Sequence, residues 1–294
     1  NRANGIYTYS GQNVTIDQNQ IIPQNAFNGI NSSYGALFTI GPSNTIGNNG
    51  VDGIFSEYCE NFTILDNDIG NNGMHGIETH FSSGFNVSSN KIWQNGEGGG
   101  CGIFFGGVTI STIENANQIW FNGAGGICFE DVLASNVTAN NVTTNYNVGI
   151  NITLFSNSNL LWDNYVTSNS AFGILIDQFS GANTLWNNYI AGNSLLNAQD
   201  LTGNTWNIAK SPGPNIIGGR NISGNYWDDY YGADVDGDGI GDTNLPYMIP
   251  GAPTPANDYA PLTNNFTGVV AAGTLNVTDG NYRMDYFLTS GGGV

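Results

Sequence analysis

The densest group of chemically active side chains in the sequence is a run of aspartates between residues 228 and 242. Four of them fall at positions 1, 3, 5 and 9 of the spacing found in calcium-binding loops: Asp234, Asp236, Asp238 and Asp242. The carbonyl group of Ile240 falls at position 7, and Leu245 replaces the bidentate glutamate of an EF-hand at position 12. We therefore predict a Ca²⁺ site that is not an EF-hand, with Asp228 or Asp229 completing its ligands. The alternative is a solvated acidic turn without a metal.

Soft and imidazole ligands, which a copper site would require, are scarce. The sequence holds two histidines, His75 and His80, and three methionines, Met74, Met248 and Met284. Met74 and His75 are adjacent, and His80 is close by, so these three residues are the candidates for a weak copper site. The alternative is that both histidines are polar residues on the protein surface.

A repeat must position these candidates. The dipeptide Gly-Ile recurs at steps of 23 to 26 residues, and the tripeptide Asn-x-Ile/Val recurs in phase with it. The segments between are short, rich in β-branched residues and bounded by Gly and Asn, whereas leucine is too sparse for a leucine-rich repeat. The repeat glycines are Gly5, Gly29, Gly53, Gly76, Gly102, Gly126, Gly149 and Gly173.

This pattern predicts an all-β chain folded as a right-handed parallel β-helix, with about 24 residues in each coil. Coils stack about 4.8 Å apart, so equivalent residues form columns along the axis. We expect an inward column of isoleucines and a column of stacked asparagine amides. We divide the chain into a β-helix (1–227), an Asp-rich loop with a Pro-rich connector (228–262) and a β-hairpin tail (263–294), whose turn we place at Asp279-Gly280.

The repeat register brings three candidate catalytic residues together. Glu57 and His80 each lie four residues after a repeat glycine, so they are adjacent across one coil step, and Glu78 shares the outward face of His80. Glu57 and Glu130 lie three coils or about 14 Å apart, which is too far for a glycosidase pair. A polysaccharide lyase would also need clustered basic residues. We therefore predict no enzymatic activity. The five basic residues are scattered: Arg2, Lys91, Lys210, Arg220 and Arg283.

Two pairs of aromatic residues repeat at the coil period. Trp162 and Trp186 are 24 residues apart, as are Tyr165 and Tyr189, so each pair stacks in register. Such rings can hold a sugar chain, or they can be simple cross-strand pairs that stabilise the stack.

Composition excludes some partners. The 23 acidic and 5 basic residues give a formal charge of −18, so nucleic acids would be repelled, and no stretch is long and apolar enough to span a membrane. The chain opens within a repeat, and we expect a processed mature form. Cys59, Cys101 and Cys128 do not indicate a disulfide framework, because the register points Cys101 and Cys128 to opposite faces.

Glycosylation sequons are numerous, as expected for a surface protein, although some arise by chance in so Asn-rich a chain. They lie at Asn13, Asn31, Asn61, Asn86, Asn136, Asn141, Asn151, Asn221, Asn265 and Asn276.

The stretch "GNYWDDYYGADVDGDGIGDTNLPYMIPG", followed by "NDYAPL", resembles the C-terminal signature of parallel β-helix repeat (PbH1) proteins of the NosD-like and archaeal surface-layer type. The resemblance covers residues 1 to 262. It implies an exported β-helix at an archaeal cell surface or in a periplasm. Relatives of this type include a copper-delivery accessory protein, sugar-active β-helices and surface-layer proteins, so the resemblance leaves the function open.

We predict an extracellular structural subunit of a surface layer, sheath or filament, which is stabilised by calcium and associates head to tail through its ends. The alternative is a carbohydrate-binding or polysaccharide-degrading surface protein. A third hypothesis is a periplasmic copper accessory protein. The expected partners are other copies of the chain and, in the alternative, glycans.

Overall fold

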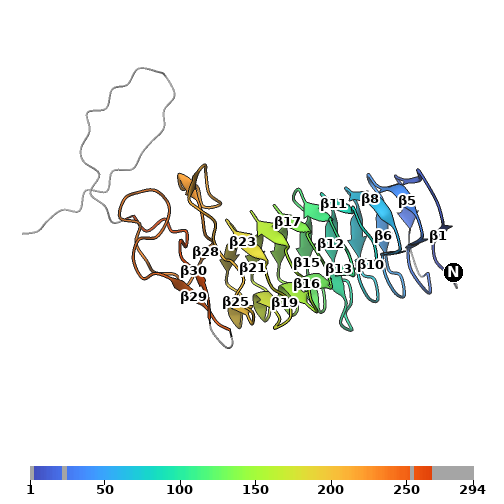
Figure 1. The fold of residues 1–294 in the computed structure, drawn as a ribbon. Helices are drawn as coiled ribbons and strands as arrows, with labels where there is room; N and C mark the ends of the chain where they lie inside the picture. The colour runs from blue at the N-terminus through green and yellow to red at the C-terminus, as the bar shows by residue number, and fades with distance from the viewer. Residues whose placement is uncertain (1–2, 22–24, 252–254, 267–294) are drawn as a thin grey trace, which may run out of the picture.

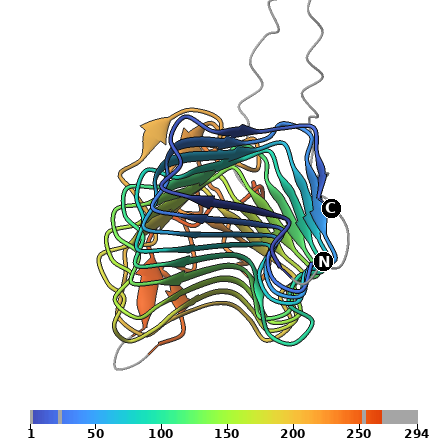
Figure 2. The same cartoon turned by 90° about the vertical axis from the view of Figure 1, so that its right-hand side faces the viewer.

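The computed structural model describes residues 3–21, 25–251 and 255–266. No helix occurs in this part of the chain, and so it contains none that could span a membrane. The strands form three long parallel sheets that wind around a common axis (Figures 1 and 2), which confirms the predicted parallel β-helix.

The three sheets are named A, B and C in the order in which the chain first visits them. Sheet A contains β1 (Ile6–Tyr9), β4 (Ile30–Ser33), β7 (Ile54–Glu57), β10 (Ile77–His80), β13 (Cys101–Gly106), β16 (Gly125–Glu130), β19 (Val148–Thr153), β22 (Phe172–Ile176) and β25 (Leu196–Asp200). Sheet B contains β2 (Thr15–Ile16), β5 (Ala36–Ile40), β8 (Glu60–Leu65), β11 (Asn86–Ser88), β14 (Thr112–Glu114), β17 (Asn136–Thr138), β20 (Leu160–Trp162) and β23 (Thr184–Trp186). Sheet C contains β3 (Gln20–Ile21), β6 (Thr45–Gly47), β9 (Asp68–Gly70), β12 (Lys91–Trp93), β15 (Gln118–Trp120), β18 (Asn141–Thr143), β21 (Tyr165–Thr167), β24 (Tyr189–Ala191) and β28 (Tyr226–Trp227).

The Gly-Ile repeat sets the register of sheet A. Ile54 pairs with Ile77, and Ile77 pairs with Ile103, and all three side chains are fully buried. The glycine before each isoleucine also faces the core, because a Cβ on Gly53 would come within 2.7 Å of the buried Ile69 side chain. Two successive residues therefore point inward, and the residues on either side of them both point outward.

This break in alternation corrects the prediction for the cysteines. Cys101 precedes one repeat glycine and Cys128 follows the next Gly-Ile pair by one residue, so both lie on the outer face of sheet A. They form a disulfide with an S–S distance of 2.03 Å. The prediction of opposite faces was wrong because it assumed strict alternation through the glycine. Cys59 is free and buried.

Asparagine side chains stack along the turns between sheets, as the sequence predicts. In the column between sheets B and C, Asn67 Nδ2 donates to Asn90 Oδ1 at 3.0 Å, and Asn90 Nδ2 donates to Asn117 Oδ1 at 3.1 Å. Each amide also binds backbone groups, so the column satisfies polar groups that the turns leave buried. A second column, between sheets C and A, contains Asn49, Asn72, Asn95, Asn122, Asn145 and Asn169.

The C-terminal end of the β-helix is covered by residues 206–251 and 255–266. Trp206 and Trp227 are buried there, and the Trp227 indole donates to Asp258 Oδ2 at 3.0 Å. Burial raises the pKa of Asp258 to about 6, against the opposing effect of its hydrogen bonds to Asn225 and Trp227. Two short antiparallel pairs accompany this cover, β26 (Ser211–Pro212) with β27 (Asn221–Ile222) and β29 (Tyr247–Ile249) with β30 (Ala256–Asp258). The predicted hairpin around Asp279-Gly280 lies outside the described residues.

Replacement of a column asparagine tests this account of the turns. We expect Asn117→Ala to lower the free energy of unfolding by about 2 to 4 kcal/mol, because buried partners on Asn90, Asn140 and Val87 lose their hydrogen bonds. Urea denaturation measures the change. The exposed neighbour Gln118 provides the control, and a loss for Asn117→Ala no larger than that for Gln118→Ala would contradict the account.

Candidate functional site

The outer wall of sheet A carries a cluster of four ionisable side chains. Asp52 and His75 each precede a repeat glycine, and Glu78 and His80 lie on β10. Asp52 and His75 are buried, whereas the side chains of Glu78 and His80 are 18% and 28% exposed. The break in alternation at the glycine is what places all four on one face. We call these residues the wall cluster.

A chain of side-chain to backbone hydrogen bonds fixes Asp52 and His75. Asn28 Oδ1 accepts from the Asp52 backbone N–H at 3.0 Å, and Asp52 Oδ1 accepts from the His75 N–H at 2.9 Å. His75 Nδ1 accepts from the Cys101 N–H at 2.9 Å. Because Nδ1 is an acceptor, a neutral His75 ring carries its proton on Nε2.

Glu78 and His80 form the exposed part of the wall cluster. Glu78 Oε1 lies 2.7 Å from His80 Nε2. Glu57 is the partner of His80 across the β7–β10 pair and accepts a hydrogen bond from Ser33 Oγ at 3.2 Å. The structure thus places Glu57, Glu78 and His80 on adjacent strands of one outer face, as their spacing from the repeat glycines predicts.

The pKa values of the four groups in the wall cluster are shifted in different directions. Burial and a hydrogen bond to Glu78 raise the pKa of Asp52 to about 8, which favours the protonated form of Asp52 at neutral pH. Burial opposes ionisation of Glu78, but hydrogen bonds from His80 and Asp52 outweigh it and hold the pKa of Glu78 below its ordinary value. The hydrogen bond to Glu78 raises the pKa of His80, and burial lowers that of His75. A charged Glu78 is therefore held between a proton-bearing carboxyl group and an imidazole that favours its protonated form.

Sequence reasoning missed Asp52 and misread His75. The interpretation of both histidines as surface residues was wrong for His75, which is 8% exposed. The signal was available, because Asp52 and His75 both precede a repeat glycine and lie one coil apart. It was hidden by the assumption of strict alternation.

A ladder of exposed aromatic rings lies beside the wall cluster, at the turn that follows sheet A. Tyr34, Tyr58 and Phe81 are 51%, 46% and 60% exposed, and their ring centroids are 5.0 and 5.3 Å apart. Tyr9 adds an edge-on ring, 5.5 Å from Tyr34. A shallow groove of about 460 Å³ lies against Tyr58 and Phe81. We call Tyr34, Tyr58 and Phe81 the aromatic ladder. Their spacing of 24 and 23 residues could have revealed it.

The predicted aromatic pairs lie on other faces. Trp162 and Trp186 stack on sheet B with centroids 5.1 Å apart, and Tyr165 and Tyr189 stack on sheet C at 5.4 Å. Neither pair lies beside the wall cluster, since that cluster belongs to sheet A. A role in sugar contact stays a prediction for these four residues.

The aspartate loop brings together part of the predicted calcium site. Asp234, Asp236 and Asp242 each offer an oxygen within 4.8 Å of the others. Asp238 instead forms an ion pair with Lys210. Asp228 and Asp229 turn towards the end of the β-helix, where both accept hydrogen bonds from Asn197. The calcium site, including the carbonyl of Ile240, stays a prediction.

The sequons differ in accessibility. Asn31, Asn86 and Asn151 lie in strands, and their side-chain oxygens are buried. Asn13, Asn61, Asn141 and Asn265 are exposed. Glycosylation stays a prediction at every sequon, and Asn276 lies outside the described residues.

The fold and the wall define a parallel β-helix protein with an ionisable cluster on its outer face. The chain belongs to the NosD family, whose model, described as periplasmic copper-binding protein (NosD), matches residues 12–232. No curated protein matches the chain.

Several solved structures share the fold. A double mutant of the periplasmic alginate epimerase AlgG is 18% identical over 67% of this chain and 58% of that chain, with a TM-score of 0.50. The A-module of the mannuronan C-5 epimerase AlgE6 from Azotobacter vinelandii is 16% identical over 66% and 58%, with a TM-score of 0.49. The DFA-IIIase from Arthrobacter chlorophenolicus A6 is 18% identical over 60% and 44%, with a TM-score of 0.43. The chain spans about half the length of these proteins, and the likeness shows the fold alone.

The wall cluster does not fit a resident copper ion. Asp52, His75 and Glu78 offer atoms within 4.8 Å of one another, but His75 Nδ1 already accepts the Cys101 N–H, which leaves the proton on Nε2. Glu78 is hydrogen-bonded to the other described histidine, His80. Two cysteines form a disulfide, and burial raises the pKa of the Cys59 thiol. Copper prefers thiolate, thioether or free imidazole donors.

The protonation of Asp52 gives a pH dependence with a definite sign. An unfolded aspartate loses its proton near pH 3.8, whereas folded Asp52 keeps it to about pH 8. The unfolded state therefore binds fewer protons between these values, so Asp52 makes the protein less stable as the pH rises. Asparagine fits this position, because Asn28 occupies it one coil earlier. We expect the Tm of Asp52→Asn, relative to the wild type, to rise steadily between pH 5 and pH 8.

Thermal unfolding across this pH range measures the difference, and Asp66→Asn, at an exposed turn, is the control. A difference in Tm that stays constant from pH 5 to pH 8 would show that folded Asp52 ionises normally.

The calcium prediction is tested by chelation. We expect EDTA to lower the Tm of the wild type and added Ca²⁺ to restore it, because a cation screens the carboxylates of Asp234, Asp236 and Asp242. Asp236→Asn and Asp242→Asn together should abolish this response, while Asp66→Asn keeps it. An identical melting curve with and without EDTA would contradict the prediction of a calcium site.

Proposed function

We propose that this protein binds a neutral polysaccharide along the outer wall of sheet A and hydrolyses it, with His80 as proton donor, Glu78 as the carboxylate that supports His80, and Glu57 as the base. One observation carries the proposal: the exposed aromatic ladder lies beside the wall cluster, in which Glu78 Oε1 is 2.7 Å from His80 Nε2. The prediction of a purely structural subunit did not include this pairing.

The aromatic ladder supplies the binding surface. Tyr34, Tyr58 and Phe81 expose about half or more of their surface, and their stacked rings follow the axis. Aromatic rings present flat apolar faces, and the C–H faces of sugar rings pack against such surfaces. Because the rings repeat at about the strand spacing, they suit a linear chain of sugar units better than a single compact ligand.

Charge favours a neutral polysaccharide over an acidic one. The chain carries a formal charge of −18. Of the basic residues in the described part, Lys91 lies on sheet C, and Lys210 and Arg220 lie beyond the last coil of sheet A. Among the described residues, an acidic sugar on the wall would therefore find only His80 to offset its charge. For this reason we do not propose alginate as the polysaccharide that this chain binds.

The wall cluster can act on a glycosidic bond. Protonated His80 can donate a proton to a glycosidic oxygen, and Glu78 behind it stabilises the charged imidazole ring. Glu57, across the strand pair from His80, can accept a proton from water. Glu57 is the direct cross-strand partner of His80, so the backbones of the proposed base and the proposed acid lie about 4.8 Å apart, one strand spacing.

The disulfide and the family description support a location. A disulfide persists in an oxidising compartment, and the family description is periplasmic. We therefore propose a periplasmic or extracellular location. The head-to-tail surface-layer subunit stays a prediction, which electron microscopy of native material tests. We do not propose the copper role, because the donors described above do not fit it.

Binding and turnover assays test the proposal. We expect saturable binding of a neutral polysaccharide, with the Kd raised at least tenfold in Tyr58→Ala, since a ring–sugar contact is lost. Tyr259→Ala is the matched control, because Tyr259 is 62% exposed and follows β30, beyond the last coil of sheet A.

His80→Asn should abolish product release and leave the Kd within about twofold. Product release by the wild type should fall as the pH rises through the raised pKa of His80, because the acid form is lost. A panel of neutral polysaccharides that gives no binding would overturn the proposal. Turnover that survives in His80→Asn would overturn the assigned role of His80.

A further inference from the structure

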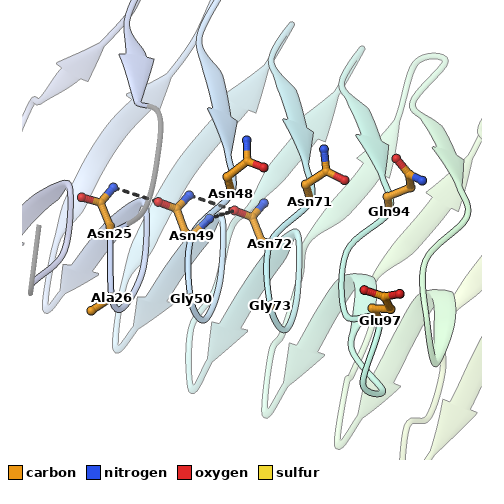
Figure 3. A pocket seen from close by; sticks show the side chains of 10 residues that line it. All are labelled: Asn25, Ala26, Asn48, Asn49, Gly50, Asn71, Asn72, Gly73, Gln94 and Glu97. Atoms are coloured by element: carbon orange, nitrogen blue, oxygen red, sulfur yellow. Dashed lines mark hydrogen bonds between the residues drawn. The ribbon is translucent and has the colours of Figure 1, made fainter.

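A second groove runs along the turn between sheets C and A, on the opposite side of sheet A from the aromatic ladder. Its first part has a volume of about 520 Å³ and is lined mainly by Asn, Gln and Gly (Figure 3). An adjoining part of about 310 Å³ shares Asn71, Gln94 and Glu97 with it and ends at Phe121 and Tyr146. The two parts therefore form one groove, which we call the corner groove. From Asn25 to Tyr146 it crosses five coil steps, or about 24 Å.

Two parallel sets of amides line the corner groove, and they differ in their partners. The amides of the inner set are hydrogen-bonded to one another. Asn49 Nδ2 donates to Asn72 Oδ1 at 2.8 Å, and Asn72 Nδ2 donates to Asn95 Oδ1 at 2.8 Å. The outer set is exposed and makes no side-chain hydrogen bond with any residue that the structure describes. Figure 3 shows these outer amides beside the inner set. The outer set consists of Asn48, Asn71 and Gln94.

The backbone positions the outer amides. Asn48, Asn71 and Gln94 have φ values of 53°, 55° and 50°, in the left-handed region that lets the chain turn sharply from sheet C towards sheet A. Their backbone N–H groups bind carbonyl groups of the next coil, such as Gly70 O and Trp93 O. The side chains thus project one above another at the coil spacing, each offering a donor and an acceptor.

The far end of the corner groove is apolar and flat. Phe121 and Tyr146 are 40% and 57% exposed, with ring centroids 6.0 Å apart and planes 26° from parallel. Glu97, on the turn before β13, adds an acceptor between the amides and the rings. No lysine or arginine lines either part of the groove.

We infer that the corner groove is a second glycan-binding site, for a neutral oligosaccharide that lies along the axis. Amides that both donate and accept match sugar hydroxyl groups, and the ring pair matches the C–H face of a sugar unit. The lack of a lining cation disfavours acidic sugars, and the lack of apolar side-chain pockets disfavours a peptide. The inference shares no residue with the proposed function of the sheet A wall, so either can fail without the other.

The test isolates the corner groove in a Tyr58→Ala/Phe81→Ala background, which removes rings of the aromatic ladder. Neutral hexasaccharides of glucose, mannose and xylose are titrated and followed by NMR of side-chain amides and by calorimetry, with hexamannuronate as the acidic comparison. We expect at least one neutral hexasaccharide to shift the amide signals of Asn48, Asn71 and Gln94. Adding Asn71→Ala/Gln94→Ala should raise its Kd at least tenfold, whereas Gln118→Ala, an exposed amide on sheet C, should leave it unchanged.

The possible outcomes separate the two sites. If the background variant binds no neutral hexasaccharide, or shifts only signals outside the groove, the inference is overturned whatever the sheet A wall does. Stronger binding of hexamannuronate than of every neutral probe overturns it as well. Binding that the Asn71→Ala/Gln94→Ala change weakens supports it even if the wall shows no turnover.

Discussion

The stacking of coils at one strand spacing is the constraint on which the rest of the structure depends. Parallel pairing commits most of the backbone of one coil to the coils on either side, and asparagine columns satisfy the turns. Only outward side chains are left for function. The neighbour of each one along the axis is the side chain at the equivalent position of the next coil. Chemical variety therefore arises along columns. The column before the repeat glycines shows this, because Asn28, Asp52 and His75 each accept the next backbone N–H, although they differ in acidity.

The sequence was sufficient to predict the architecture. The Gly-Ile step predicted the isoleucine column, from Ile30 through Ile54 to Ile77, and the asparagine step predicted the amide ladder. Both succeed because a solenoid repeats its local environment, so one periodic marker defines the register of every coil. The same register was enough to bring Glu57, Glu78 and His80 onto one face.

Strict alternation failed where the glycine and the isoleucine both face the core. That local break hid the Cys101–Cys128 disulfide and the proximity of Asp52 and His75 to Glu78, which no pattern of period two would reveal. Protonation was also beyond the sequence. The raised pKa of Asp52 depends on its burial and on a carboxylate from the next coil. The difference between Asn72, whose amide is hydrogen-bonded to Asn95, and the exposed Asn71 depends on which way each side chain points at the turn.

The wall of sheet A is the centre of the functional account, because the aromatic ladder and the wall cluster meet there. The most direct test is a crystal structure of the protein with a bound neutral oligosaccharide. The account predicts sugar rings packed on Tyr58 and Phe81, with a glycosidic oxygen within hydrogen-bonding distance of the His80 ring. An oligosaccharide that binds elsewhere and leaves this wall bare would contradict it.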